Sequence, residues 1–245
     1  MIPLFSSDFS IGRSILKVKS SGGPDSILDI AKENSLEEVF LVEDSMIGFL
    51  DSFKIFSAND IALRYGVRFN MCNNVEDEKV EDSSYKIVLF ALNDEGCKSL
   101  YKIYSIAHTK HNSFLDQKIL KENMSDNLLI FHPFYNSYIY NNLFYFKNCI
   151  YEKVSDQEYY TIEDNNLPFD NMLLNNISKL GLPTTKTKTI LYKNKEDVEA
   201  YQVYRMSCNR SFGKSRSLSS PSLDHFSSDE FCWESYMEKI NGVAV

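Results

Sequence analysis

Short apolar runs rich in β-branched and aromatic residues recur along the chain and alternate with segments of helical spacing. The runs that predict strands are residues 39–43, 66–71, 86–92, 127–131, 148–151 and 187–192. They do not alternate strictly between apolar and polar residues. This indicates strands buried on both faces, as in a parallel sheet.

The intervening segments that predict helices are residues 24–34, 45–57, 58–65, 94–108, 171–180 and 196–208. The clearest is 94–108, where Asp94 favours the positive N-terminal end of a helix. Leu100, Ile103 and Ala107 repeat there at helical spacing. Alternating strands and helices predict an α/β fold, either a barrel or a doubly wound sheet, and the pattern does not separate the two.

Two segments depart from this alternation. Residues 75–84 are acidic and poor in apolar side chains, and residues 211–228 are rich in serine. Both predict surface loops.

The composition fits a globular protein, since 43% of the 245 residues are hydrophobic and 24% are charged. The formal net charge of −8 argues against a protein whose entire surface binds nucleic acid. No apolar run approaches the roughly 18 residues of a membrane span, and the N-terminal residues lack the order of a signal peptide. We expect a soluble, cytoplasmic protein without membrane contact.

One basic stretch contains no acidic residue and lies beside two tyrosines. Its cations are Arg205, Arg210, Lys214 and Arg216. They form a candidate DNA contact, although such runs are more often solvated faces.

Residues 86–110 resemble the strand, Asn-x-x-Gly turn and helix of the PHP (polymerase and histidinol phosphatase) domain, in the version that opens the alpha subunit of bacterial DNA polymerase III. The matching residues are Ala91, Asn93, Gly96, Leu100, Lys102, Ser105 and Ala107. The likeness extends to residues 7–10, 66–68 and 179–205. It implies a distorted (β/α)7 TIM-like barrel in one domain over 1–245, with a core of about 1–210 and an extension over 211–245.

In active members of that family, a cluster of metal ligands supports phosphoester hydrolysis. The resemblance places the ligand positions on Leu4, Ser6, Asn74 (or Asn73), Lys86, Thr189 and Leu191. Leucine cannot bind a metal, and lysine brings a positive charge to a cation site. None of the four histidines falls on a ligand position. The resemblance therefore implies an eroded metal site and no tightly bound cofactor.

Three residues near this site have side chains that could bind a metal or transfer a proton. Glu43 ends a predicted strand and Asp44 follows it. Their two carboxylates would suit one weakly held Mg²⁺ or Mn²⁺, or would cap the next helix. His132 also follows a strand, where barrel active sites lie. These are the candidate catalytic residues, and local structural roles are the alternative for each.

The resemblance implies a non-catalytic structural or docking module in DNA replication. Its expected partners are a DNA polymerase core or a proofreading exonuclease. The chain would be a free-standing protein, for example from a phage with a split polymerase, or an N-terminal fragment. The alternative is a metal-dependent phosphoesterase or 3′–5′ exonuclease with an altered ligand set.

Overall fold

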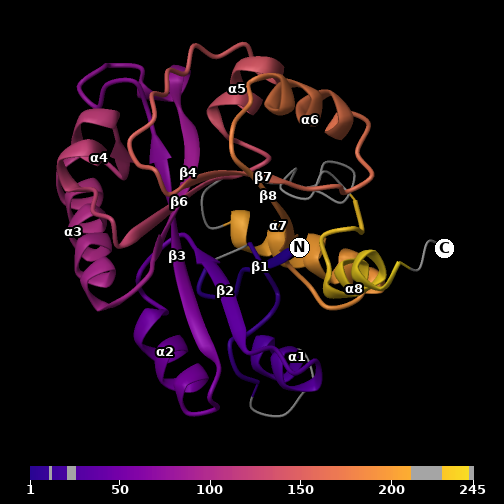
Figure 1. The fold of residues 1–245 in the computed structure, drawn as a ribbon. Coiled ribbons are helices and arrows are strands. Elements are labelled where there is room, and N and C mark those ends of the chain that lie inside the picture. The colour runs from indigo at the N-terminus through magenta and orange to yellow at the C-terminus, as the bar shows by residue number, and fades with distance from the viewer. Residues whose placement is uncertain (11–12, 21–25, 211–227, 243–245) are drawn as a thin grey trace.

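The computed structural model describes residues 1–10, 13–20, 26–210 and 228–242, except for the side chains of residues 209 and 210 (Figure 1). The strands are β1 (Ile2–Phe5), β2 (Glu38–Glu43), β3 (Ala62–Met71), β4 (Tyr85–Ala91), β5 (Phe114–Leu115), β6 (Leu128–His132), β7 (Glu158–Ile162) and β8 (Thr184–Ile190). The helices are α1 (Ile27–Glu33), α2 (Phe49–Ser57), α3 (Asp94–Lys110), α4 (Gln117–Asn123), α5 (Tyr138–Phe144), α6 (Asp170–Lys179), α7 (Val198–Arg210) and α8 (Trp233–Asn241). Single 3₁₀ turns lie at Val80–Ser83 and Lys195–Asp197.

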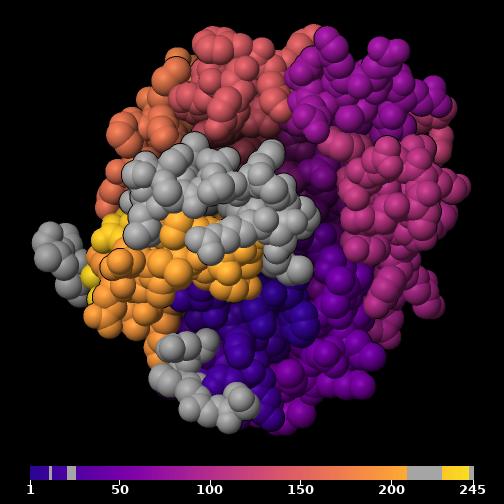
Figure 2. Space-filling model, turned by 180° about the vertical axis from the view of Figure 1, so that it is seen from behind, coloured from indigo at the N-terminus to yellow at the C-terminus, as the bar shows by residue number. Residues whose placement is uncertain are grey.

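Seven strands close into a barrel in the order β1-β2-β3-β4-β6-β7-β8, with β8 pairing back to β1. The short β5 adds to β3 outside this ring. Helices lie around the outside of the strands, with α3 and α4 together on one side (Figure 1). From behind, α3 and α4 form one edge of the surface, and residues around position 200 lie on the other (Figure 2). Of the two α/β folds that the pattern allowed, the barrel is the one observed.

The expectation of a parallel sheet is wrong for one strand. β4 runs antiparallel to both β3 and β6, whereas all other pairings in the ring are parallel. A parallel connection needs a crossover of a dozen or more residues, usually a packed helix. Residues 72–84 contain only one 3₁₀ turn and few apolar side chains, so they reverse the chain direction instead.

Other expectations change at the element level. Residues 58–65 do not form a helix, because β3 begins at Ala62, and residues 148–151 do not form a strand. The apolar runs do not predict β1, β5 or β7. Helix α3 is confirmed, and Asn93 caps it by accepting a hydrogen bond from the Gly96 amide at 3.0 Å. Most of the Ser-rich segment lies outside the described residues.

A small apolar cluster fills the interior of the barrel. Its buried members are Leu4, Val42, Val88, Phe90 and Phe131. Gly66 on β3 makes room for one of them, because a Cβ at this position would come within 2.6 Å of the Phe90 ring. Among the described residues, the inside of the barrel is therefore a packed core.

Gly96→Ala is expected to destabilise the protein, although alanine is normally about 1 kcal/mol better than glycine in a helix. A Cβ at this position would lie 2.2 Å from the Asn127 carbonyl oxygen, so α3 would have to move away from the segment before β6. We expect a loss of about 1–3 kcal/mol in the free energy of unfolding, measured by urea titration. Lys102→Ala, at an exposed site on the same helix, is the control. A stabilised Gly96→Ala protein would contradict this packing.

Candidate functional site

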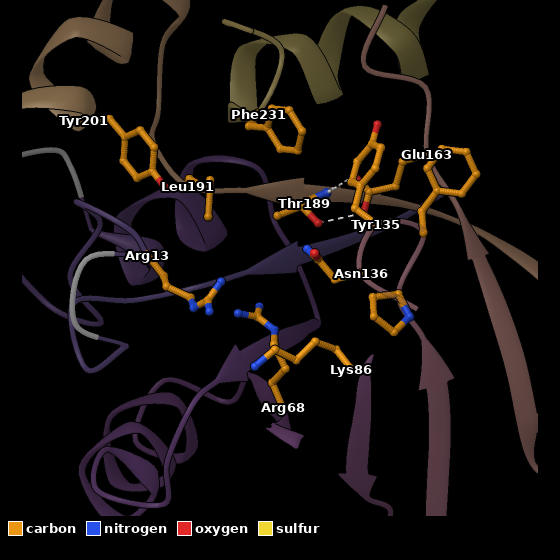
Figure 3. Close-up of a pocket in the computed structure, with 12 residues that line it drawn as sticks. Arg13, Arg68, Lys86, Tyr135, Asn136, Glu163, Thr189, Leu191, Tyr201 and Phe231 are labelled. Atoms are coloured by element: carbon orange, nitrogen blue, oxygen red, sulfur yellow. Dashed lines mark hydrogen bonds between the residues drawn. The ribbon is translucent and has the colours of Figure 1, made fainter. Parts of the chain in front are cut away.

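A cavity of about 180 Å³ opens at one end of the barrel (Figure 3). It lies where the parallel strands end at their C-termini, the end at which barrel enzymes place their active sites. Its lining residues are Arg13, Arg68, Lys86, Pro133, Phe134, Tyr135, Asn136, Glu163, Thr189, Leu191, Tyr201 and Phe231. Because β4 is antiparallel, its first residues come to the same end, and this places Lys86 at the mouth.

The loop after β6 folds over this opening. Asn136 has a left-handed backbone with φ of 65°, and its carbonyl oxygen accepts a hydrogen bond from the Lys86 amide at 2.8 Å. This bond ties the loop to the start of β4. Asn136 lies between Lys86 and Thr189 in the close-up, and the polar atoms of Thr189 point toward Glu163 (Figure 3).

Asp44 binds two of the cations at the mouth. Its Oδ2 lies 2.7 Å from Arg13 Nε, and its Oδ1 lies 3.2 Å from Arg68 Nη1. Burial alone would raise the pKa of Asp44, but the positive charges of Arg68, Arg13 and Lys86 together lower it. Asp44 is therefore a carboxylate at neutral pH and brings both guanidinium groups onto one side of the cavity.

Glu43 lies fully buried behind this group. One carboxyl oxygen accepts hydrogen bonds from the Ser7 amide at 2.9 Å and the Ser7 hydroxyl at 2.6 Å, and the other accepts from the Ser10 hydroxyl. Burial raises the pKa of Glu43 to about 7, although these hydrogen bonds oppose the shift. The expected capping role is wrong, because Gly48 precedes α2 and no side chain caps that helix.

The opposite wall carries a second carboxylate. Glu163 Oε1 accepts from the Thr189 hydroxyl at 2.6 Å, and Oε2 accepts from the Thr189 amide at 3.2 Å and from Asn165 at 3.0 Å. Asn165 also donates to the Tyr135 hydroxyl at 2.9 Å, and Tyr135 donates to Asp170 at 2.9 Å. Glu163 is thus held by donors of the protein itself.

The structure brings together most of the positions that the PHP resemblance assigns to metal ligands. Five of them line the mouth or the barrel just below it: Leu4, Ser6, Lys86, Thr189 and Leu191. Asn74 does not line this cavity, because it lies in the loop after β3, which ends at Met71. There the Asn74 side chain accepts a hydrogen bond from the Glu76 amide at 3.0 Å.

These residues do not fit a metal cluster. Ser6 donates its hydroxyl to the Val42 carbonyl at 2.9 Å, and Lys86 donates to the side-chain oxygen of Asn70. Glu43 and Asp44 point to different partners and do not share a site. Among the described residues, no three His, Cys, Asp or Glu side chains are placed to hold a metal ion.

His132 lies away from this mouth. Successive residues of a strand face opposite sides, so Pro133 lines the cavity while His132 packs outside the barrel wall. Its ring stacks on Tyr160 at 4.3 Å, and Nε2 lies 3.5 Å from a Glu158 oxygen. Burial lowers the pKa of His132. It is not brought together with Glu43 or Asp44.

Of the proposed DNA-contacting cations, only Arg205 has a described side chain, and it is 8% exposed on α7. The side chain of Arg210 and the whole of Lys214 and Arg216 lie outside the described residues. Arg205 therefore does not present an exposed charge to DNA in this structure.

Sequence reasoning missed Arg13 and Arg68 as site residues. A signal for Arg68 exists in the alternation of residues 66–71, which puts Gly66, Arg68 and Asn70 on one face of β3. The packing of Gly66 against Phe90 shows that this face is the inside of the barrel. No comparable local signal marks Arg13, which lies in the loop after β1.

No known protein-family model matches the chain, and no curated protein matches its sequence. In the part of the chain that the structure describes, no helix is both long and apolar enough to cross a membrane.

Proposed function

We propose that the chain is a PHP-like barrel of the distorted (β/α)7 type, related to the alpha subunit of bacterial DNA polymerase III, and acts as a non-catalytic docking module in DNA replication. It would work in the cytoplasm, bound to a DNA polymerase core or to a proofreading exonuclease. The resemblance at residues 86–110 supports this relationship.

One observation carries the non-catalytic part of the proposal. Lys86 stands on a position that the resemblance assigns to a metal ligand, and its positive charge acts on Asp44. Two guanidinium groups bind the same carboxylate. Cationic side chains thus take the part of the mouth where metal ions would have to bind.

Apolar side chains on the surface support the docking part. Ile47 is 79% exposed, and Leu50 and Phe53 on the adjoining α2 are about half exposed. Contiguous apolar groups on a surface are typical of protein-binding sites. We name this surface the α2 surface.

The first test is complex formation. The chain is mixed with the polymerase core from the same genome and, separately, with its proofreading exonuclease, and each mixture is passed over a sizing column. We expect a stable complex with one of them, weakened at least about tenfold by Leu50→Asp because a charge would then be buried in the interface. Asp51→Asn, also exposed on α2, is the matched control. No complex with either partner would overturn the docking role.

The second test is hydrolysis. p-Nitrophenyl phosphate and 3′-labelled DNA are incubated with the chain and Mg²⁺, Mn²⁺ or Zn²⁺, and we expect no release above background. Metal-stimulated hydrolysis that Asp44→Ala abolishes would overturn this proposal and support the phosphoesterase alternative.

A further inference from the structure

A second cavity, of about 200 Å³, lies outside the barrel wall, and none of its described lining residues lines the mouth. Three tyrosines and one glutamate line it: Tyr138, Tyr151, Tyr160 and Glu158. Glu158 and Tyr160 are two residues apart on β7, so they face the same side of this strand, whereas Thr161 between them lines the barrel interior. Tyr138 is the first residue of α5. We name this cavity the tyrosine pocket.

The three rings of the tyrosine pocket form a corner. The Tyr138 ring is nearly parallel to that of Tyr151, at 22° and 5.5 Å between centroids, and steeply inclined to that of Tyr160, at 73° and 6.1 Å. The hydroxyls of Tyr138 and Tyr160 lie 3.0 Å apart, and one donates a hydrogen bond to the other. His132 stacks on Tyr160 at 4.3 Å and holds that ring in place. Because the face of an aromatic ring attracts a cation within about 6 Å of its centroid, this corner suits a positive charge.

Glu158 adds a negative charge to the corner. Its Oε1 accepts hydrogen bonds from the amides of Val154 and Ser155, each at 2.6 Å, and its Oε2 lies 3.5 Å from His132 Nε2. Burial alone would raise the pKa of Glu158, but its contacts with His132 and with the two amides lower it. Burial lowers the pKa of His132. At neutral pH the pair is therefore a carboxylate beside a neutral imidazole, and the charge of Glu158 is not cancelled by His132.

The cation at the rim of the tyrosine pocket is paired with a different carboxylate. Lys153 lines the pocket and its charge acts on Glu158, but its ammonium lies 2.5 Å from Asp156 and its side chain is 62% exposed. Water and salt screen an exposed ion pair much more than they screen a buried charge. Counted over these three described residues, one negative charge remains at the pocket.

The walls favour a quaternary ammonium group over a primary one. A primary ammonium that leaves water must find hydrogen-bond acceptors, and its burial without them is costly. Here the hydroxyls of Tyr138 and Tyr160 bond to each other, and Glu158 Oε1 already accepts from two amides. A trimethylammonium group needs no hydrogen bond, and its methyl groups can pack against Leu182 and Pro183, which also line the pocket. A volume of about 200 Å³ is several times the roughly 30 Å³ of one liquid water, which leaves room for such a group.

We propose that the tyrosine pocket binds the trimethylammonium group of a small organic cation, through the rings of Tyr138, Tyr151 and Tyr160 and the charge of Glu158. The pocket binds its ligand and no bond is broken. The inference depends on contacts outside the barrel and not on the docking role. A failure to bind the cation would leave polymerase docking intact, and the reverse also holds.

The test is calorimetric titration of the full chain with choline and with 3,3-dimethylbutanol, which has the same shape as choline but carries no charge, at constant ionic strength. We expect saturable binding of choline and at least about tenfold weaker binding of the neutral alcohol. This comparison uses the unmodified protein, so it does not depend on the folding of a variant. Absence of choline binding at millimolar concentration, or equal binding of the two compounds, would overturn the proposal.

Variants of the lining residues test which side chains bind the cation. Glu158→Gln keeps an oxygen for the backbone amides and removes the charge, and Tyr138→Leu removes one ring, so each should weaken choline binding at least about fivefold. Tyr138→Phe keeps the ring and should retain binding. Glu95→Gln and Tyr101→Leu, at exposed sites on α3, are the matched controls and should bind as the unmodified protein does. Equal binding by Glu158→Gln, Tyr138→Leu and the controls would contradict the proposal. Thermal melting of each variant checks that it is folded.

A third arm distinguishes a small cation from a trimethylated lysine of another protein, since both carry the same group. The ligand in this arm is the N-acetyl methylamide of trimethyl-lysine. Binding of choline at least as tight as that of the lysine derivative supports the small cation. Binding of the lysine derivative about tenfold tighter than that of choline would overturn this assignment.

Discussion

Replacing Glu230 by leucine is expected to lower the free energy of unfolding by about 3–5 kcal/mol, because the change leaves a buried cation without its counter-charge. Lys188 on β8 is 0% exposed, and its ammonium lies 3.2 Å from a Glu230 oxygen and 2.6 Å from the Asn165 side-chain oxygen. Burial lowers the pKa of Lys188. Urea titration should show a lower midpoint with an unchanged slope.

Two further variants show how much of the lost stability comes from the unpaired charge and how much from other lost interactions. Lys188→Met combined with Glu230→Leu removes both charges and should recover much of the stability. Glu152→Leu breaks an exposed ion pair with Lys121 and should cost less than about 1 kcal/mol. If the double variant were no more stable than Glu230→Leu, the loss would come from the hydrogen bonds that Asn166 and Ser235 donate to Glu230.

Glu43 should make the stability of the protein fall as the pH rises through neutrality. Its pKa is about 7 in the folded protein against 4.5 for an ordinary glutamate, so the folded state holds its proton more tightly. The stability that this proton contributes is fully present below about pH 4.5 and is lost as the pH passes 7. From pH 5 to pH 8 the loss is about 2–3 kcal/mol, since one unit of pKa corresponds to about 1.4 kcal/mol.

Glu43→Gln tests this directly, because glutamine keeps the neutral form at every pH. The difference in unfolding free energy between the unmodified protein and Glu43→Gln should shift by about 2–3 kcal/mol in favour of the variant between pH 5 and pH 8. Glu95→Gln, at an exposed site on α3, controls for the loss of one carboxyl group and should shift by less than about 0.5 kcal/mol. A constant difference for Glu43→Gln would show that its carboxyl is already ionised at pH 5.

A cationic mouth supports the proposal that the site is not catalytic. Arg13 and Arg68 hold Asp44 as a carboxylate, and Lys86 adds its charge to the same group. That arrangement opposes the binding of a metal ion.

Local signals predicted some parts of this molecule well. Helix α3 follows from the spacing of Leu100, Ile103 and Ala107, and Asn93 is a strong capping residue. The strand predicted at residues 148–151 is wrong, because a short apolar run can lie in a packed loop as well as in a strand. There the backbone amide of Ile150 donates to the Asn73 side chain at 2.8 Å instead of joining the sheet.

Position along the chain does not by itself identify a site residue, as His132 shows. The sequence predicts it just after a strand, as for an active-site histidine, but His132 is the last residue of β6, and a strand presents alternate side chains to opposite faces. Pro133 is therefore the residue at the cavity, and His132 packs against Tyr160. The sequence places both residues at the strand end without showing which one faces inward.

The sequence by itself determined the alternation of strands and helices, the well-capped α3 helix and the residue types that stand where the PHP resemblance expects metal ligands. The tertiary structure decided that the barrel closes, that β4 runs against its neighbours, and that Lys86 thereby meets Arg13, Arg68 and Asp44. Helix formation and capping depend on residues a few positions apart. The cationic mouth joins residues far apart in the chain, and a change of strand direction or a one-residue shift in register would turn these side chains elsewhere.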